Sequence, residues 1–539
     1  MNALEPQRGG RQQVENDMTQ AILSRQTLFD VLRRTAARYP DKLAIQQNAL
    51  SWNYREFHEL CLRVAGGLAG LGIQPGDRVA VLSRNSATFA ATRYALTAMG
   101  VILVPVNFML NIDEAAYILD HSGSRILFAG NSEFDKGMAL LDRCRALEQL
   151  AWLDTGPGAP AGIPTFDNLA AAQPYSGAPP VDASAPAQII YTSGTESAPK
   201  GAVLSHAAVL WQYSSCIADA EIAHEDVLLH SMPLYHCAQL DCFLGPSIQV
   251  GGTNIITDDT SPDNLLRLLE SQKISSYFAP PTVWISLLNS PLFGGADLSA
   301  LKKGYYGASI MPVEIMKRLQ GSLSRIRLWN LYGQTEIAPT ATILKPEDQL
   351  RKPGSAGKPV LHVETRVVDD AMNDVPVGEV GEVVHRSPQL LTCYYNDPER
   401  TADAFRGGWF HSGDLATIDT DGYITIVDRK KDMIKTGGEN VSGREVEETI
   451  YQLDGVAETA VVGLSHPKWI EAVVAMVVLQ PDAALTEQDI ISHCVDRLAG
   501  FKVPKRVVFV EELPRNPSGK ILKRNLRELY QTEFAGALL

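Results

Sequence analysis

Apolar residues in the first part of the chain recur at the spacing of an α-helix. One amphipathic face spans residues 27–39, and the sequence PDKLAI that follows has the apolar character of a strand. A second helix is predicted at residues 54–71, and the turn QPGDR after it leads into the strand VAVLS. Because this alternation continues to about residue 330, we expect an α/β fold with largely parallel sheets.

The pattern changes after residue 355. Short apolar stretches separated by glycine turns (VETRVVDD, GEVGEVVHRS, GWFHSGDLATID and DGYITIVDR) predict a small antiparallel β unit. From Glu445 onward, helix and strand alternate again, which predicts a compact α+β segment. With a hinge at Asp428–Arg429, we expect a mobile leader at residues 1–25, a large N-terminal domain at 26–428 and a small mobile C-terminal domain at 429–539.

Composition places the chain among ordinary globular proteins and narrows its partners. Hydrophobic residues make up 45% of the 539 residues and charged residues 20%. Lysine and arginine number 48 against 62 acidic residues, a formal charge of −14, so no general attraction draws the protein to nucleic acid or to an anionic membrane surface. Any anion that it binds must be held by a local site.

Cysteine usage and hydropathy indicate a cytoplasmic enzyme. The seven cysteines include no C-x-x-C pair, which argues against a disulfide framework or a zinc ribbon. The polar N-terminus lacks the apolar core of a signal peptide. The uncharged run between Arg93 and Asp113 could cross a bilayer, but Gly100 and Pro105 interrupt it and favour a buried helix followed by a buried strand. We therefore expect no integral membrane association.

The strongest chemical signal is the sequence YTSGTESAPKG at residues 191–201. Hydroxyls, glycines and one lysine after a strand form a loop of N–H and O–H donors with a mobile cation, which suits a polyphosphate. It is not a Walker A loop, because the required G-K-[ST] order is absent. Taken alone, such a stretch is more often an ordinary loop.

The loop resembles the phosphate-loop signature of the adenylate-forming superfamily, which includes acyl-CoA synthetases, nonribosomal adenylation domains and firefly luciferase. Further stretches that resemble the superfamily's signatures follow in the same order: Tyr306–Pro312 (YGASIMP), Asn330–Glu336 (NLYGQTE), Trp409–Asp414 (WFHSGD), Asp428–Lys435 (DRKKDMIK) and Asn516–Lys520 (NPSGK). The resemblance spans roughly residues 25 to 530 and identifies the chain as a member of this superfamily, close to the acyl-CoA synthetases.

The resemblance implies an ATP- and Mg²⁺-dependent acid–thiol ligase. The carboxylate of the acid attacks the α-phosphate of ATP, pyrophosphate leaves, and a thiol then accepts the acyl group. Negative charge gathers in the first transition state, so fixed cations and donors must surround the phosphates. In the family these roles would fall to Thr335 at the α-phosphate, to Glu336 at Mg²⁺ and, at the β- and γ-phosphates, to Thr192, Ser193, Gly194, Thr195 and Lys200.

The same resemblance assigns the nucleoside. Tyr332 offers an aromatic face for adenine beside Gly333, and Gly307 and Ala308 leave room for the base. Asp414 would accept both ribose hydroxyls, because an ionised carboxylate only accepts hydrogen bonds, and Arg429 would add a third ribose contact.

The small domain carries the residue to which the resemblance assigns the adenylation step, Lys520. A lysine against the carboxylate and α-phosphate oxygens neutralises charge as the new bond forms. We expect the small domain to close for adenylation and then to rotate about Asp428, which would bring Lys435, Gly437 and Gly438 to the thiol entrance.

The acid site is expected around Pro233–His236, where the family has a histidine beside the bound carboxylate. Amino-acid-activating relatives place an aspartate here to bind the ammonium group, whereas this sequence has HCAQL at residues 236–240, which argues against amino acids. His236 beside Cys237 lacks the second ligand pair of a metal site. Trp284 and Ser309 belong to apolar or small segments that suit a hydrocarbon or aromatic acid. A medium- or long-chain fatty acid is the first expectation, and an aryl- or cinnamate-type acid is the second.

Coenzyme A is the expected acceptor, by analogy with acyl-CoA synthetases. The alternatives are an acyl-AMP ligase that loads a carrier protein and a non-catalytic nucleotide-binding homologue, although the latter should have lost Lys200, Glu336 or Lys520. The sequence does not choose between a monomer and a homodimer. Glu196 and Ser197 stand where many family members have threonine and glycine, and we hypothesise that Glu196 assists the metal.

Overall fold

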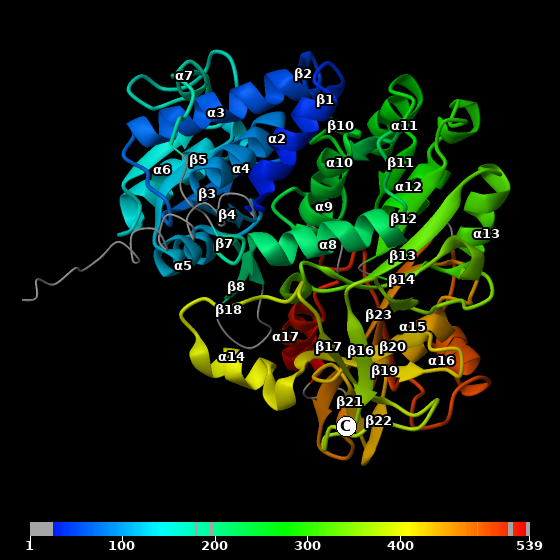
Figure 1. Cartoon of the computed structure of the whole chain (residues 1–539). Coiled ribbons are helices and arrows are strands. Elements are labelled where there is room, and N and C mark those ends of the chain that lie inside the picture. The colour runs from blue at the N-terminus through cyan, green and yellow to red at the C-terminus, as the bar shows by residue number, and fades with distance from the viewer. Residues whose placement is uncertain are drawn as a thin grey trace, which may run out of the picture.

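The strands of the chain form four sheets within the described residues, and three of these sheets lie in the N-terminal part (Figure 1). The computed structural model describes residues 25–177, 182–192, 199–307, 309, 311–481, 483–515 and 521–534. The predicted leader at 1–25 falls almost wholly outside this range, as do the phosphate-loop residues 193–198, Ala308 and the NPSGK motif at 516–520.

The first sheet contains the strands that flank the phosphate loop. Its inner strands are parallel, and two antiparallel strands, β8 and β18, complete one edge. In spatial order they are β18 (Cys393–Tyr394), β8 (Lys200–Ser205), β7 (Pro186–Thr192), β4 (Ile102–Val106), β3 (Arg78–Leu82), β5 (Ser124–Ala129) and β6 (Gln149–Trp152).

The second sheet carries the start of the predicted adenine segments, at residues 306–307 and 330–333, and the predicted acid segment follows one of its strands. It too is parallel at its centre and antiparallel at both ends. Its order is β15 (Lys358–Pro359), β14 (Thr340–Leu344), β13 (Arg327–Gly333), β12 (Lys303–Gly307), β11 (Ser276–Phe278), β9 (Val227–His230), β10 (Thr253–Ile256), β1 (Leu43–Gln47) and β2 (Leu50–Asn53). The expected α/β architecture with largely parallel sheets is confirmed.

The third sheet is the predicted antiparallel β unit, and the fourth belongs to the C-terminal segment. The third has the order β16 (Glu364–Val368), β17 (Gly381–Arg386), β19 (Phe410–Ile418) and β20 (Ile424–Arg429). The fourth joins β22 (Glu439–Val441), β21 (Ile434–Thr436), β24 (Ile470–Leu479) and β23 (Val456–His466), with β25 (Arg506–Phe509) beside β24. The predicted hinge, Asp428–Arg429, therefore lies at the end of a paired strand.

Helices cover the sheets, and the helices predicted at residues 27–39 and 54–71 both form. The first has a capping box between Thr27 and Asp30, which satisfies backbone N–H groups at its N-terminus. The main helices are α2 (Leu28–Arg38), α3 (Tyr54–Gly70), α4 (Ala87–Met99), α5 (Ile112–Ser122), α6 (Phe134–Arg143), α7 (Phe166–Ala170), α8 (His206–Asp219), α10 (Gly245–Val250), α11 (Pro262–Ser271), α12 (Pro281–Asn289), α13 (Val313–Ser322), α14 (Pro398–Ala404), α15 (Gly443–Ile450), α16 (Glu487–Val495) and α17 (Lys523–Phe534).

The uncharged run after Arg93 divides into the end of α4 and the buried strand β4, as its pattern predicts. Among the described residues, no helix combines the length and the apolar character that a membrane crossing requires. Arg93 itself is buried and pairs with Asp241 at 2.5 Å, where a π-helical turn (Leu240–Leu244) follows the acid segment. Removing one partner of such a buried ion pair lowers the free energy of unfolding by about 3–5 kcal/mol. The pair therefore stabilises the π-helical turn that follows His236 in the chain.

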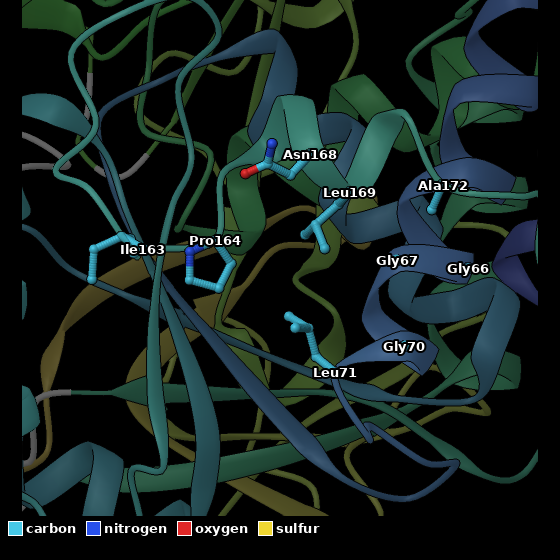
Figure 2. A pocket seen from close by; sticks show the side chains of 10 residues that line it. Gly66, Gly67, Gly70, Leu71, Ile163, Pro164, Asn168, Leu169 and Ala172 are labelled. Atoms are coloured by element: carbon cyan, nitrogen blue, oxygen red, sulfur yellow. The ribbon is translucent and has the colours of Figure 1, made fainter.

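A surface pocket of about 580 Å³ lies between α3 and the segment at residues 162–172 (Figure 2). The segment packs closely on α3 because Gly66 has no side chain, and a Cβ there would lie 1.9 Å from the carbonyl oxygen of Gln173. None of the predicted site residues lines this pocket.

Candidate active site

The two flanks of the phosphate loop are held together by strand pairing. Thr192, the last residue of β7, lies opposite Lys200, the first residue of β8. The Lys200 ammonium lies 4.9 Å from the centre of the Tyr394 ring. Ser193, Gly194, Thr195 and Glu196 lie between these flanks, outside the described residues. The sequence thus brings the loop's lysine to a fixed place at the edge of the first sheet.

The Y-G-Q-T-E motif forms the end of β13 and a short 3₁₀ turn at Thr335–Ile337. Gly333 is required here, because a Cβ would lie 1.9 Å from the carbonyl oxygen of Pro339. Glu336 is only 9% exposed, and its Oε1 accepts a hydrogen bond from the Tyr394 hydroxyl at 2.9 Å. The structure therefore places the predicted metal ligand and the predicted phosphate lysine on either side of one tyrosine.

The acid segment meets the same turn. The Cys237 thiol lies 3.4 Å from the hydroxyl of Thr335, the residue expected at the α-phosphate. His236 directly precedes Cys237 in the chain. Nδ1 of His236 accepts the backbone N–H of Ala238 at 3.1 Å, which leaves the proton of a neutral imidazole on Nε2. Burial raises the pKa of the Cys237 thiol to about 12, which keeps it protonated and unreactive.

The residues predicted at the ribose are also brought together. Oδ2 of Asp414 accepts a hydrogen bond from the Tyr332 hydroxyl at 2.6 Å, and Oδ1 lies 3.2 Å from Nε of Arg429. Asp414 and Arg429 face each other across β19 and β20, while Tyr332 comes from β13. Burial strongly raises the pKa of Tyr332, and the neighbouring Asp414 adds to this, so the phenol stays a donor.

Gly307 and the acyl-pocket residues have different surroundings. Gly307 ends β12, where a Cβ would lie 2.6 Å from the carbonyl oxygen of Leu331, and Ser309 is exposed. Trp284 is buried in the core, and its indole N–H donates to the carbonyl of Tyr305 at 3.1 Å. Tyr277 stands between Trp284 and Ser231 of the acid segment, so direct substrate contact by Trp284 stays a prediction.

The predicted thiol-entrance residues form a hairpin of the small domain. Lys435 is exposed on β21, and Gly437 and Gly438 turn the chain with φ angles of +61° and +92°, which glycine adopts without strain. The hairpin of β21 and β22 lies apart from β8 and β13 (Figure 1). Lys520, expected to complete the adenylation site, is outside the described residues.

Comparison with known proteins agrees with this geometry. The family model described as AMP-binding enzyme matches residues 32–395, and that of the AMP-binding enzyme C-terminal domain matches residues 445–520. The chain belongs to the AMP-binding enzyme family.

Relatives of this AMP-binding enzyme match it over most of its length. A feruloyl-CoA synthase of Amycolatopsis sp is 34% identical over 92% of this chain and 98% of its own. The long-chain-fatty-acid–CoA ligase FadD13 of Mycobacterium tuberculosis is 36% identical over 88% of this chain and 93% of its own. The crystal structure of the anthranilate CoA ligase AuaEII with anthranoyl-AMP matches with a TM-score of 0.88 at 26% identity, covering 94% of this chain and 98% of that one. The resemblance to the adenylate-forming superfamily is confirmed, and the enzyme is an AMP-forming acid–thiol ligase.

Two residues that contact the candidate site of this AMP-binding enzyme were not predicted from the sequence. Tyr394 contacts Glu336 and Lys200, as described above. Asn85 holds the acid segment: its Nδ2 donates to the carbonyls of Met232 at 2.9 Å and Thr257 at 3.2 Å, and its Oδ1 accepts the N–H of Leu234 at 2.8 Å. No local pattern marks either residue, because their partners lie far away in the sequence.

The site fits a magnesium–nucleotide complex. Among the described residues, no group of three or more His, Cys, Asp or Glu side chains could hold a metal by itself. Mg²⁺ bound with a nucleotide needs only one or two carboxylates, since phosphate oxygens and water complete its octahedron. Glu336, with one oxygen held by Tyr394, fits that requirement.

Proposed function

We propose that the protein is an ATP- and Mg²⁺-dependent acid–CoA ligase that forms an acyl adenylate with release of pyrophosphate and then the acyl-CoA thioester. The observation that carries the proposal is one contiguous cluster. Cys237, which follows His236 in the chain, contacts Thr335, the neighbouring Glu336 is bonded to Tyr394, and the Tyr394 ring contacts Lys200. The groups expected for the acid, the α-phosphate, the metal and the outer phosphates therefore meet in one place.

In the adenylation step, the acid carboxylate attacks the α-phosphorus and the bond to pyrophosphate breaks. Thr335 donates to an α-phosphate oxygen, and Lys200 offsets charge on the departing pyrophosphate. Glu336 would hold Mg²⁺, which supplies charge neutralisation between the phosphates when it is bound. The imidazole of His236, whose Nδ1 accepts the backbone N–H of Ala238, is our assignment for the group that orients the acid.

Nucleoside recognition falls to the cluster around Asp414. Each carboxylate oxygen has two lone-pair directions, and Tyr332 and Arg429 each occupy one. Asp414 therefore retains acceptor capacity for both ribose hydroxyls. Tyr332 remains our assignment for the adenine face, with Gly307 providing room for the base.

The thioester step requires the small domain to turn. Lys520 would serve adenylation, and rotation at Asp428–Arg429 would then bring the hairpin with Lys435, Gly437 and Gly438 to the acyl group. The Asp428 carboxylate accepts the N–H of Gly443 at 2.9 Å, which joins the strand end to the first helix of the small domain. This contact supports Asp428 as the place where motion is transmitted.

The acid is apolar in this proposal. A medium- or long-chain fatty acid remains the first choice and agrees with the relative FadD13. An aryl- or cinnamate-type acid is the second candidate, and it is favoured by similarity to the feruloyl-CoA synthase and to the indoleacetate–CoA ligase of Aromatoleum aromaticum, which is 31% identical over 93% of this chain and 98% of its own. A cytoplasmic location and a monomer or homodimer complete the proposal.

An acid-panel assay tests it. Purified protein with ATP, Mg²⁺ and CoA is given fatty acids of increasing length, cinnamates and benzoates, while AMP, pyrophosphate and thioester are measured. AMP and thioester that appear together and vanish in Lys520→Ala support the ligase and identify the acid class. Pyrophosphate without thioester points to a carrier protein as acceptor, and no pyrophosphate with any acid favours a non-catalytic nucleotide-binding protein.

A further inference from the structure

A five-residue segment links the metal-binding turn to the strand that carries Lys200. At one end, the N–H of Leu391 donates to the carbonyl of Glu336 at 2.7 Å. Further along, Cys393 and Tyr394 pair with Val203 and Ala202 of β8. The segment at residues 391–395 is therefore bound to both halves of the phosphate end of the site by its backbone.

Tyr394 makes the corresponding link with its side chain. Its hydroxyl donates to Oε1 of Glu336 at 2.9 Å, and the Lys200 ammonium lies 4.9 Å from its ring centre. The ring and the hydroxyl act on different partners, so substitutions can separate the two contacts.

We propose that Tyr394 is a positioning residue for the adenylation step: its hydroxyl fixes Glu336 so that Oε2 is presented to Mg²⁺, and its ring holds Lys200 toward the phosphates. The inference rests on the proposed roles of Glu336 and Lys200. A freely rotating carboxylate would have to be ordered when the metal–nucleotide complex binds, whereas Tyr394 orders it beforehand.

Two variants separate the two contacts. Tyr394→Phe keeps the ring and removes the hydroxyl, and it should raise the Mg²⁺ concentration for half-maximal adenylation about tenfold, as expected for loss of a hydrogen bond to a charged group. Tyr394→Leu removes the ring as well. At saturating Mg²⁺, its KM for ATP should be about three times that of Tyr394→Phe. The KM for the acid should stay unchanged in both variants.

A binding measurement provides a readout that does not depend on turnover. The affinity for α,β-methylene-ATP is measured by calorimetry at a series of Mg²⁺ concentrations. Tyr394→Phe should shift this Mg²⁺ dependence to higher concentration by the same factor. Tyr54→Phe is the matched control, because it also removes a buried tyrosine hydroxyl, here bonded to the carbonyl of Gly252 at 2.5 Å, but in the core. It should lower the melting temperature and leave the Mg²⁺ dependence unchanged.

Glu336→Gln distinguishes failure of the inference from failure of the proposed function. If Glu336→Gln leaves the Mg²⁺ dependence unchanged, the assignment of the metal to Glu336 is wrong, and the inference falls with it. If Glu336→Gln shifts the dependence but Tyr394→Phe changes only the melting temperature, as Tyr54→Phe does, the positioning role alone is overturned. The double variant should shift the dependence no further than Glu336→Gln, since both changes act on one interaction.

Discussion

The proposed ribose end and the proposed phosphate end of the site are held in different ways. At the ribose end, Asp414 has two partners, Tyr332 and Arg429, and one of them is fixed opposite it by the register of β19 and β20. At the phosphate end, Lys200 belongs to the first sheet and Glu336 to the 3₁₀ turn after β13, and the side chain of Tyr394 lies between them. Two side chains from different elements hold Asp414. At the phosphate end, Tyr394 is the side chain that contacts both Glu336 and Lys200, and the backbone of its segment is bonded to the same two elements.

This difference has a consequence for function. A nucleoside has the same shape throughout the reaction, so a rigid, doubly supported carboxylate serves it well. The phosphates and the metal change their charge distribution as pyrophosphate leaves, and preorganised groups there act on the transition state itself. We therefore expect substitutions at the ribose end to appear in the KM for ATP and those at the phosphate end to appear in Mg²⁺ dependence and rate.

The substitution Asp414→Asn should break the ribose end. The amide loses acceptor capacity and leaves Arg429 without its carboxylate, so the KM for ATP should rise about 10- to 100-fold, the range for one or two hydrogen bonds to a charged group. The Mg²⁺ concentration for half-maximal activity should not move. Steady-state kinetics with ATP and Mg²⁺ varied independently measure both quantities, and a shift in Mg²⁺ dependence would contradict the separation of the two ends.

The substitution Asn85→Ala tests whether another side chain that links distant segments behaves as Tyr394 does. The side chain of Asn85 bonds to the backbone at Met232, Leu234 and Thr257, and its loss leaves buried carbonyls without a donor. We expect the KM for the acid to rise about tenfold, and the free energy of unfolding to fall by about 1–3 kcal/mol. Denaturant unfolding and kinetics with acid and ATP varied separately provide the measurements.

The half-buried Asn264, which also bonds to Thr257, supplies the control for Asn85. Its amide bonds to Asp259 and Thr257 near the surface, so Asn264→Ala should leave the KM for the acid unchanged. An equal rise of the KM for the acid in Asn85→Ala and Asn264→Ala would mean that Asn85 stabilises the domain without orienting the acid segment.

A smaller effect is expected for Tyr332→Phe. The hydroxyl bond to Asp414 is lost, but Arg429 still holds the carboxylate at 3.2 Å and the aromatic ring remains for adenine. The KM for ATP should rise less than about threefold, since Arg429 remains as the second support of the buried carboxylate. The informative comparison is between the fold-change in the KM for ATP in Tyr332→Phe and the fold-change in Mg²⁺ dependence in Tyr394→Phe. Similar fold-changes would show that the ribose end is no better supported than the phosphate end.

Local patterns predicted the elements of this fold well, but contacts between distant elements could not be read from them. The helix that begins at Leu28 and the four strands of the β unit follow from apolar spacing and glycine turns. Trp284 gave no such signal, because a tryptophan after Pro-Pro can face either a pocket or the core, and its indole bonds to Tyr305 in the core. Tyr394 lies 58 residues from Glu336 in the sequence. The backbone bond between Leu391 and Glu336 and the pairing of β18 with β8 bring the two residues together.

The smallest effect is expected at Cys237, which lies at the centre of the cluster and yet should be chemically silent. Its thiol contacts Thr335 at 3.4 Å, and burial raises its pKa to about 12, so about one molecule in 10⁴ carries the thiolate at pH 8. Iodoacetamide at pH 8 should leave Cys237 unmodified in the folded enzyme, as peptide mass spectrometry would record, and Cys237→Ser should retain activity within about threefold because the hydroxyl can keep the contact with Thr335. Rapid alkylation with parallel loss of adenylation would show instead that the acid segment opens in solution, and the phosphate end would then be even less firmly held than the ribose end.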